Sequence, residues 1–489
     1  MDFTAINLVP VYAELFVLAA TCLILVIDLF LTDERRWITA TLTLATLAGA
    51  ALITTFVSGV HERVVTLNGM YVADPMGDVL KLFVYLIVGV SLLYARGYLA
   101  KRELFRGEYY VLSLLAMLGI MVIISGNSLL TIYLGVELQA LALYAMVAFN
   151  RESGIAAESA MKYFVLGAIA SGTLLYGISI IYGVTGSFAL DDVAHALTGT
   201  SANDVGLLFG VAFIVVGVAF KFGAVPFHMW IPDVYHGAPT SVTLFLGSAP
   251  KIASFAFAIR VLAEGLAATG TAWTEMLTVL SVLSMGLGNV VAIAQTNLKR
   301  MLAYSTISHV GFILLGILAG TTRGYQAAMF YTLAYVITAV GSFGMILLLS
   351  RKGFEADQLD DFKGLNQRSP WYAAVMLMLM FSTAGVPPFI GFFAKLYVIL
   401  AVLDRGMVWL AIVAIFFSVI GAFYYIRIVK LMYFDDPQDT SPIEADRSMR
   451  FLLSLNGLAV LVLGIVPAWL FNLVAATCCS TGLVANLPR

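Results

Sequence analysis

Long runs of apolar residues recur along the whole chain, separated by short polar segments. Each run is about 20 residues long, the length that a helix needs to cross the roughly 30 Å hydrocarbon core of a bilayer. The pattern predicts fourteen membrane-spanning helices, numbered here as spans one to fourteen. They are expected roughly at 9–31, 37–59, 76–96, 109–126, 129–149, 161–187, 204–225, 240–265, 273–294, 302–320, 324–350, 372–401, 407–433 and 451–475.

The runs are apolar on all sides, as residues 109–125 illustrate. A strand of a membrane β-barrel instead alternates apolar and polar residues over about ten positions. A barrel is therefore excluded, and each helix must satisfy its own backbone groups in lipid. The fold class expected is an all-α polytopic membrane protein with little chain left for a soluble domain.

Composition agrees with a membrane protein, since 61% of the residues are hydrophobic and only 11% are charged. The 27 basic and 29 acidic residues nearly balance, which argues against nucleic acid as a partner. Cys22, Cys478 and Cys479 lack the spacing of metal ligands. The first span has neither a basic leader nor a small-residue cleavage site, so we expect a retained helix.

Basic residues are unevenly shared between the loops. Loops after even-numbered spans show only Arg63, Arg323 and Arg405, and most other loop lysines and arginines follow odd-numbered spans. Positive loops stay on the cytoplasmic side of a membrane. We therefore expect the loops after odd-numbered spans to be cytoplasmic and both termini to be periplasmic.

Two spans are interrupted by proline within similar short sequences. Span seven contains Gly223-Ala-Val-Pro226-Phe227, and span twelve contains Gly385-Val-Pro387-Pro388-Phe389. Because the two lie five spans apart, equivalent helices would cross the membrane in opposite senses, as in the inverted repeats of transporters. The alternative is that two common proline kinks match by chance. The repeat predicts four parts: 1–105 with spans one to three, 106–266 with spans four to eight, 267–435 with spans nine to thirteen, and 436–489 with span fourteen.

Charged side chains deep inside the spans are the main candidates for function, because each costs about 2.5 to 3.5 kcal/mol at the bilayer centre. Four stand away from span ends: Glu137, Lys221, Lys251 and Lys395. Glu137 is too short to reach the interface, so it is expected to be protonated or paired with a cation. The alternative to a transport role is a static buried ion pair that fixes helix packing.

Lys221 shortly precedes Pro226, whose ring removes the amide that would bond the carbonyl of Phe222. We expect this free carbonyl, with water, beside the Lys221 ammonium. Movement of a nearby carboxylate could then switch the lysine between holding and releasing a proton. Lys251 follows Pro250 directly, and because its helix start is ill-defined it could instead be an interfacial lysine that reaches the headgroups. Lys395 lies two helical turns after Pro388 and is the firmer of these two candidates.

Further polar residues are possible relays or structural groups. His228 follows the break in span seven and His309 lies early in span ten; histidine can pass protons near neutral pH, but a membrane histidine is as often a packing hydrogen-bonder. Lys162 could modulate Lys221, or form a solvated i, i+4 pair with Glu158. Structural roles are expected for four residues near the ends of the first three spans: Glu14, Asp28, Asp78 and Lys81.

No nucleotide-binding motif, haem-ligand pair or cysteine cluster is found in the sequence. Neither nucleotide hydrolysis nor electron transfer can be assigned to these residues. A chain of ionisable groups through both halves of the repeat is instead suited to moving protons. The energy would come from an ion gradient or from a partner subunit.

Two motifs carry a resemblance to a known family. They are Gly217-Val-Ala-Phe-Lys221-Phe-Gly-Ala-Val-Pro226-Phe-His228-Met-Trp230-Ile-Pro232-Asp233-Val-Tyr235-His-Gly237-Ala-Pro239-Thr and Gln295-Thr-Asn-Leu-Lys299-Arg300-Met-Leu-Ala-Tyr304-Ser305-Thr-Ile-Ser308-His309-Val-Gly311. Both resemble the antiporter-like subunits of NADH:quinone oxidoreductase (respiratory complex I) and of multisubunit cation/proton antiporters. The likeness covers spans four to thirteen. It is closest to the subunit N branch, because subunit M has glutamate in place of Lys395 and subunit L carries a lateral helix after its core, whereas Arg489 follows soon after span fourteen.

The resemblance implies a proton-translocating subunit of an inner-membrane respiratory enzyme. The family's glutamate and lysine of the first half-channel match Glu137 and Lys221, its bridging lysine matches Lys251, and its second half-channel lysine matches Lys395. It also implies that NADH, FMN, iron-sulfur clusters and quinone are bound by partner subunits, with neighbouring antiporter-like subunits and the lipid bilayer around this chain. The alternatives are a subunit of a sodium or potassium/proton antiporter, and a non-conducting structural subunit.

Overall fold

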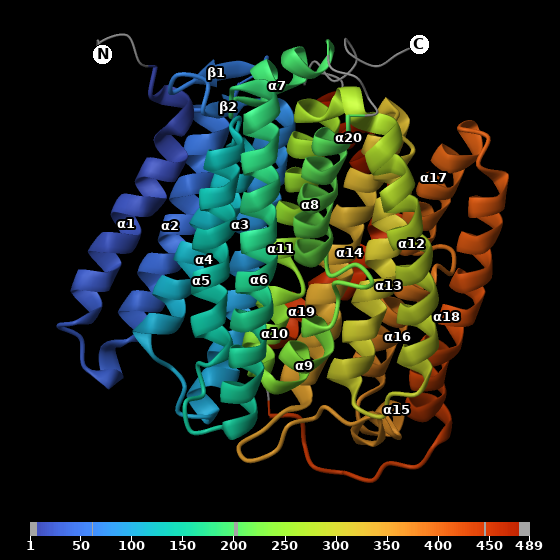
Figure 1. Cartoon of the computed structure of the whole chain (residues 1–489). Coiled ribbons are helices and arrows are strands. Elements are labelled where there is room, and N and C mark those ends of the chain that lie inside the picture. The colour runs from blue at the N-terminus through green and yellow to red at the C-terminus, as the bar shows by residue number, and fades with distance from the viewer. Residues whose placement is uncertain (1–6, 61, 200–203, 445, 479–489) are drawn as a thin grey trace.

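The computed structural model describes residues 7–60, 62–199, 204–444 and 446–478, and nearly all regular structure in them is helical (Figure 1). The N-terminal part contains α1 (Tyr12–Asp28), α2 (Trp37–Phe56), β1 (Val64–Thr66), β2 (Tyr71–Ala73) and α3 (Pro75–Lys101). Next come α4 (Gly107–Ser125), α5 (Leu129–Val147), α6 (Gly154–Thr185), α7 (Leu190–Leu197), α8 (Val205–Phe222), α9 (Trp230–Gly237), α10 (Thr240–Leu246), α11 (Ala249–Ala258) and the π-helix η4 (Ile259–Gly265). The remainder contains α12 (Gly270–Ile293), α13 (Leu298–Leu318), α14 (Thr322–Leu349), η6 (Leu359–Phe362), α15 (Leu365–Arg368), α16 (Pro370–Ala384), α17 (Ile390–Asp404), α18 (Val408–Phe434), α19 (Arg447–Ile465) and α20 (Pro467–Cys478).

Thirteen helices of the described residues are long and apolar enough to cross a membrane. One further crossing is made in two parts by α16 and α17, which follow each other through the bundle (Figure 1). The predicted all-helical polytopic fold is therefore confirmed. A break in the last span, between α19 and α20 at Pro467, was not predicted. Cys479 lies outside the described residues.

The two ends of the helix bundle differ in their connections. One end, here called the hairpin face, carries the antiparallel β1–β2 hairpin and α7 and is uppermost in Figure 1. The opposite end, here called the basic face, carries the loops after α1, α3 and α5, together with the segments 350–369 and 435–444. These segments contain most of the loop lysines and arginines.

Polar residues set the limits of several helices. Five side chains at helix starts accept a backbone amide of the first turn, as N-caps do: Asp74, Ser153, Asp204, Asn297 and Thr321. The helices α8 and α16 end inside the bundle at Gly223 and Gly385, whose φ angles are +79° and +87°. Left-handed backbone favours glycine, so these residues end both helices where the spans are broken.

Glycine also allows two helix pairs to approach closely. A Cβ added to Gly119 would lie 2.5 Å from the backbone nitrogen of Gln139, and one added to Gly288 would lie 2.6 Å from that of Ser308. Small residues let membrane helices pack backbone to backbone. The pair α4–α5 and the pair α12–α13 therefore pack alike. Gly288 lies 169 positions after Gly119, and Ser308 lies 169 positions after Gln139.

The loops around these helices repeat the same spacing on opposite faces. The amide of Leu129 donates to the carbonyl of Phe188 at 2.9 Å, and the amide of Leu298 donates to that of Asp357 at 2.6 Å. Both residues of the second bond again lie 169 positions after those of the first. The first bond is at the hairpin face and the second at the basic face, which supports the predicted inverted repeat. The boundaries at residues 105, 266 and 435 stay a prediction.

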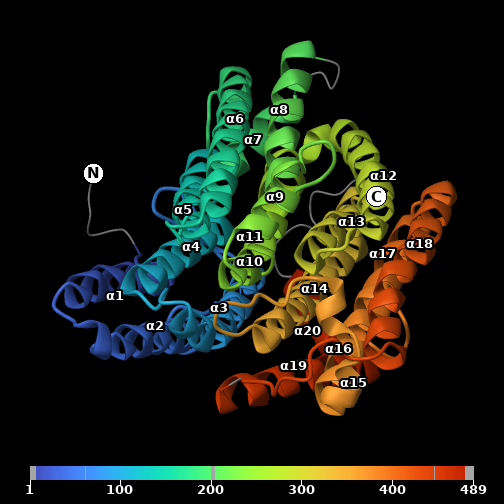
Figure 2. The same cartoon turned by 90° about the horizontal axis from the view of Figure 1, so that it is seen from below.

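The centre of the bundle is formed by the helices α10, α11, α13 and α14, and α1, α2, α12 and α18 lie at its edges (Figure 2). The most apolar stretch of α14 is completely buried inside the protein, whereas only about a third of that of α18 is buried. Edge helices expose large apolar side chains such as Leu52, Val279 and Val419. These side chains suit a lipid or protein environment, and the central helices α11 and α13 hold Lys251 and His309.

A buried ion network lies near the hairpin face, where sequence reasoning placed no candidate. The guanidinium of Arg260, in η4, is fully buried and lies 2.7 Å from the carboxylate of Asp74 and 2.8 Å from that of Glu264. Its Nε also donates to the carbonyl of Ile124 at 3.1 Å. Asp74 in turn caps α3 through the amide of Gly77. One arginine therefore ties α3, α4 and η4 together.

Replacement of Arg260 by methionine should lower the free energy of unfolding by about 3 to 5 kcal/mol, because it leaves the buried Asp74 carboxylate without its cation. The drop is measured as a lower thermal unfolding midpoint of the detergent-solubilised protein. Arg323→Met is the matched control, since it breaks an ion pair with Asp404 whose side chains are about half exposed and should cost at most about 1 kcal/mol. Equal losses in the two variants would contradict a structural role for the buried network.

Candidate functional site

Glu137 lies in the middle of α5 and is half-buried. Its carboxylate accepts a hydrogen bond from the Ser171 hydroxyl of α6. The Ser171 oxygen also lies 3.1 Å from the Tyr133 hydroxyl, which can donate to it because serine has a single hydroxyl proton. No ion pair of Glu137 within 4 Å is found in the described ranges, so the predicted direct pairing with a cation is absent from this state of the protein.

Lys221 lies in the last turn of α8, just before the break. Its ammonium has neither a hydrogen bond nor an ion pair to any residue that the structure describes. Glu137 still acts on it electrostatically across the space between α5 and α8. The ammonium therefore has donor capacity left for a hydrogen bond to water.

A small cavity is lined by both Lys221 and Lys251. About 340 Å³ of space lies between its lining atoms, which include Gln139, Tyr163 and Ser254. The part of this space that a water molecule can occupy is about 10 Å³, close to one water molecule. Both lysines line this cavity, so one water could connect them.

Lys251 is deeply buried in α11, with 1% of its surface exposed. Its ammonium donates to the carbonyl of Phe222 at 2.7 Å and lies 5.7 Å from the centre of the Trp230 ring. The Phe222 carbonyl is the one that Pro226 leaves without its helical amide. The sequence had suggested that this freed carbonyl lies beside the Lys221 ammonium. In the structure Lys251 donates to it instead. The alternative of an interfacial Lys251 was wrong.

Lys395 repeats this arrangement in the second half of the chain. It is 7% exposed in α17, and its ammonium donates to the carbonyl of Ala384 at 2.9 Å and to the Ser418 hydroxyl at 3.0 Å. Ala384 stands four residues before Pro388, so its carbonyl also lacks a helical amide. In both breaks a buried lysine satisfies the carbonyl that proline frees, although the lysine comes from a neighbouring helix in one case and from the continuing helix in the other.

His309 lies near the middle of α13, because that helix begins at Leu298 rather than at the expected residue 302. Its Nδ1 lies 2.7 Å from the Tyr331 hydroxyl and its Nε2 lies 3.0 Å from the Tyr425 hydroxyl. Lys395 is near enough to act on it electrostatically. His309 thus belongs to a hydrogen-bonded cluster between α13, α14 and α18, on the side of Lys395.

The two other candidates lie away from this cluster. His228 is half-buried within the break between α8 and α9. Lys162 is about 44% exposed and lies 2.9 Å from both Glu158 and Asp233, while Asp233 also accepts from Arg300. No contact between Lys162 and Lys221 is found in the described part of the chain. The proposed influence of Lys162 on Lys221 stays a prediction, and its direct partners are surface carboxylates.

The pairs at the ends of the first three spans have structural partners. Glu14 and Lys81 form a buried ion pair of 2.6 Å, and Lys81 also donates to the Tyr71 hydroxyl. Asp78 accepts the amide of Val60, and Asp28 accepts the hydroxyl of Thr39. These contacts join α1, α2 and α3, in agreement with the structural roles expected for them.

Sequence reasoning missed several polar residues that surround the site. Tyr331 and Tyr425 escaped notice because tyrosine is not charged at neutral pH and is common in membrane helices. Lys299 was assigned to a loop, but it is buried in the first turn of α13 and donates to the carbonyl of Ala238 at 2.8 Å. The Asn297 cap that starts α13 earlier than expected was the available signal.

The arrangement consists of groups that can bind and release protons. Its groups are a carboxylate, three lysines and a histidine, separated by hydroxyls, freed carbonyls and a cavity with room for about one water molecule. Within the described ranges, no group of three or more His, Cys, Asp or Glu side chains could hold a metal ion. Intramembrane groups of this kind mark proton pathways.

Comparison with known proteins gives the same assignment. Residues 126–421 match the family model described as NADH:quinone oxidoreductase/Mrp antiporter, TM. The chain is 59% identical over 467 residues, 96% of each chain, to NADH-quinone oxidoreductase subunit N of Thiobacillus denitrificans.

Solved structures show the same fold. A chain of respiratory complex I from Thermus thermophilus with bound aureothin is 29% identical, with a TM-score of 0.81 over 95% of this chain and 100% of that one. A chain of the Mrp complex from Dietzia sp. is 22% identical and is similar in fold, with a TM-score of 0.83 over 96% of each chain. The chain therefore belongs to the NADH:quinone oxidoreductase/Mrp antiporter family of membrane subunits, as an antiporter-like subunit N of bacterial NADH:quinone oxidoreductase.

Proposed function

We propose that Glu137, Lys221, Lys251 and Lys395 carry the protons that this subunit of NADH:quinone oxidoreductase translocates. The observation that supports this most directly is the state of the lysines at the two proline breaks. Lys251 and Lys395 are held by freed carbonyls, and Lys221 has no fixed partner beside a cavity that admits about one water molecule. Such a chain of groups contains two lysines that can hold a proton through a fixed hydrogen bond and one, Lys221, that can release its proton more easily.

The first transfer is governed by the charge on Glu137. An ionised carboxylate favours the protonated Lys221, and protonation of the carboxylate removes that attraction. Lys221 then loses its proton through the cavity toward a Lys251 that has already given up its own proton, and the transfer is short because both residues line the same space. The Ser171 hydroxyl holds Glu137 in position on α5.

The second half receives the proton through groups near His309. Its two ring nitrogens are joined to Tyr331 and Tyr425, so protonation at one nitrogen can be matched by release at the other. Lys395 then discharges to the far side of the membrane. The Ser418 hydroxyl and the Ala384 carbonyl keep its ammonium solvated inside the protein.

The basic face is proposed to be cytoplasmic, in a multi-pass protein of the bacterial inner membrane. The positive-inside rule supports this orientation, because most loop lysines and arginines are on that face. The start of α1 and the end of α20, on the hairpin face, would then be on the periplasmic side, in line with the periplasmic termini expected from the sequence. Protons would enter the first half from the basic face and leave the second half at the hairpin face.

Partner subunits are proposed to bind NADH, FMN, iron-sulfur clusters and quinone, and quinone reduction there would supply the free energy. A neighbouring antiporter-like subunit is proposed to cover the outer side of α5. Leu134 and Leu141, which flank Glu137 along that helix, are 65% and 56% exposed. A half-buried carboxylate cannot face acyl chains without a large cost, so protein cover is better suited to this surface than lipid.

Glu137→Gln and Lys221→Met, each alone, should lower proton pumping per quinone reduced in the reconstituted complex by at least about half. The reason is that each variant removes one site at which the proton must reside. Pumping is measured as acidification inside vesicles together with NADH oxidation. Glu152→Gln, in an exposed loop, is the matched control and should pump normally.

The same variants distinguish a structural subunit from a conducting one. If Glu137 and Lys221 only fix helix packing, the double variant Glu137→Gln/Lys221→Met should pump normally while the single variants fail to assemble. Normal pumping by both single variants would contradict the assignment of these residues.

The likeness in fold to a chain of the Mrp complex supports a second candidate function, the exchange of sodium or potassium for protons. For a proton-pumping subunit, acidification driven by NADH should be equally fast in sodium, potassium and choline media. Exchange would instead appear as proton movement driven by a sodium or potassium gradient without NADH. That result would favour the antiporter alternative.

His309→Phe should lower the thermal unfolding midpoint as well as pumping. It leaves the Tyr331 and Tyr425 hydroxyls buried without their histidine partner, at about 1 to 3 kcal/mol for each hydroxyl that finds no other. Tyr425 keeps its hydrogen bonds to Ser305 and Tyr424, so the double variant with Tyr331→Phe should regain part of the stability but not the pumping. Recovery of both would show that His309 only packs the helices.

A further inference from the structure

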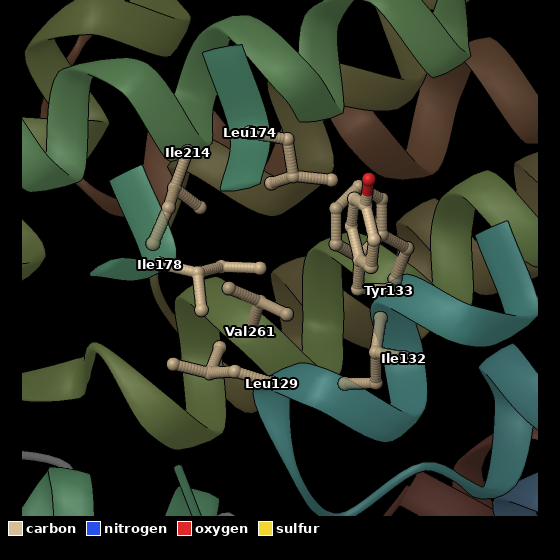
Figure 3. A pocket seen from close by; sticks show the side chains of 8 residues that line it. Leu129, Ile132, Tyr133, Leu174, Ile178, Ile214 and Val261 are labelled. Carbon is tan, nitrogen blue, oxygen red and sulfur yellow. The ribbon is translucent and has the colours of Figure 1, made fainter. Parts of the chain in front are cut away.

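A cluster of apolar side chains, here called the apolar layer, surrounds a narrow space in the first half of the protein (Figure 3). Its side chains come from α5, α6, α8, α11 and η4 and line one narrow space. They include Leu174 and Ile178 from α6, Ile214 from α8 and Val261 from η4. Tyr133 of α5 forms one wall with its ring.

The layer lies on the hairpin-face side of Glu137, Lys221 and Lys251, the three candidate proton carriers of this half. Ile214 is seven residues nearer the hairpin face than Lys221 along α8, or about 10 Å at 1.5 Å per residue. Val261 lies ten residues beyond Lys251 in the same direction. Ile178 is seven residues beyond Ser171, the hydrogen-bond partner of Glu137. A proton held on Glu137, Lys221 or Lys251 must therefore cross this layer to reach the hairpin face directly.

The layer is dry, in contrast to the cavity between the lysines. About 190 Å³ of space lies between its lining atoms, but no part of it is wide enough for a water molecule. The polar atom of its lining side chains is the Tyr133 hydroxyl, which is turned toward Ser171 and Glu137. The cavity at Lys221 and Lys251 does have room for about one water molecule. Water can therefore reach the lysines from within the site while the space toward the hairpin face stays empty.

We propose that this apolar layer is the barrier that stops protons on Glu137 from leaking straight to the hairpin face. The proposal rests on the proposed function, because it needs Glu137 to carry a proton. Proton transfer requires water or hydrogen-bonding side chains, and a narrow apolar gap offers neither. Hydrophobic constrictions close membrane pores in this way, by excluding water. The barrier makes the proton take the longer path through Lys251 into the second half.

The test introduces hydroxyl groups into the layer and measures passive leak. Ile178→Thr/Ile214→Thr removes bulk and adds two hydroxyls that can hold water, and Ile214→Thr alone is a milder version in case the pair disturbs folding. The complex is reconstituted into vesicles with a pH-sensitive dye inside, and a pH step is applied without NADH. NADH:quinone turnover of the same preparation shows that the complex has assembled.

Both variants should speed the decay of the pH step by about tenfold, the change in rate that a barrier lower by about 1.4 kcal/mol gives. Addition of Glu137→Gln should bring the decay back to the wild-type rate, because the leak passes through that carboxylate. The matched control is Ile155→Thr/Ile169→Thr on α6, where both side chains are more than 60% exposed on the protein surface. It should leave the decay unchanged.

A wild-type rate of decay in both layer variants would overturn the barrier. A leak that persists with Glu137→Gln would also overturn it, since the protons would then bypass the carboxylate. These outcomes are distinct from failure of the proposed function, which would appear as normal pumping by Glu137→Gln with an intact layer.

Discussion

Inside a membrane, both an ammonium group and a carbonyl without its helical amide need a hydrogen-bond partner. At each of the two proline breaks, a lysine ammonium donates to the carbonyl that the proline leaves unbonded. Pro226 and Pro388 remove the amides that would bond the carbonyls of Phe222 and Ala384. Lys251 and Lys395 fill these places at 2.7 and 2.9 Å. A break that would be costly in lipid is thus stabilised by a charge that would be costly there as well. The pairing places a titratable group at each break.

The surrounding structure divides into a rigid frame and a less constrained site. Arg260 and Asp74 pin η4 to α3 near the hairpin face, while glycine lets α4 and α12 pack tightly on their neighbours. Lys221, by contrast, has no fixed partner in the described chain, and it faces a space with room for about one water molecule. A proton carrier needs such a difference, because the frame keeps the positions fixed while the charge on one group changes.

Much of the fold could be predicted from the sequence, because long apolar runs have few alternatives in lipid. The spans, both breaks and the four charged positions follow from run length, proline and the cost of buried charge. The partner of the Phe222 carbonyl could not be predicted, since it depends on the approach of α11 to the break. Arg260 was missed because charges near span ends were set aside as able to reach the interface. His309 was placed too near a helix end because the Asn297 cap was overlooked.

The central claim is that the buried lysines at the breaks are hydrated and exchange protons inside the membrane. A density map of the assembled complex, at a resolution that shows ordered water, tests it most directly. The account predicts the Lys251 and Lys395 ammonium groups on the Phe222 and Ala384 carbonyls, with water in the cavity beside Lys221. Lysine side chains directed to the headgroups, or facing acyl chains with no water between them, would contradict it.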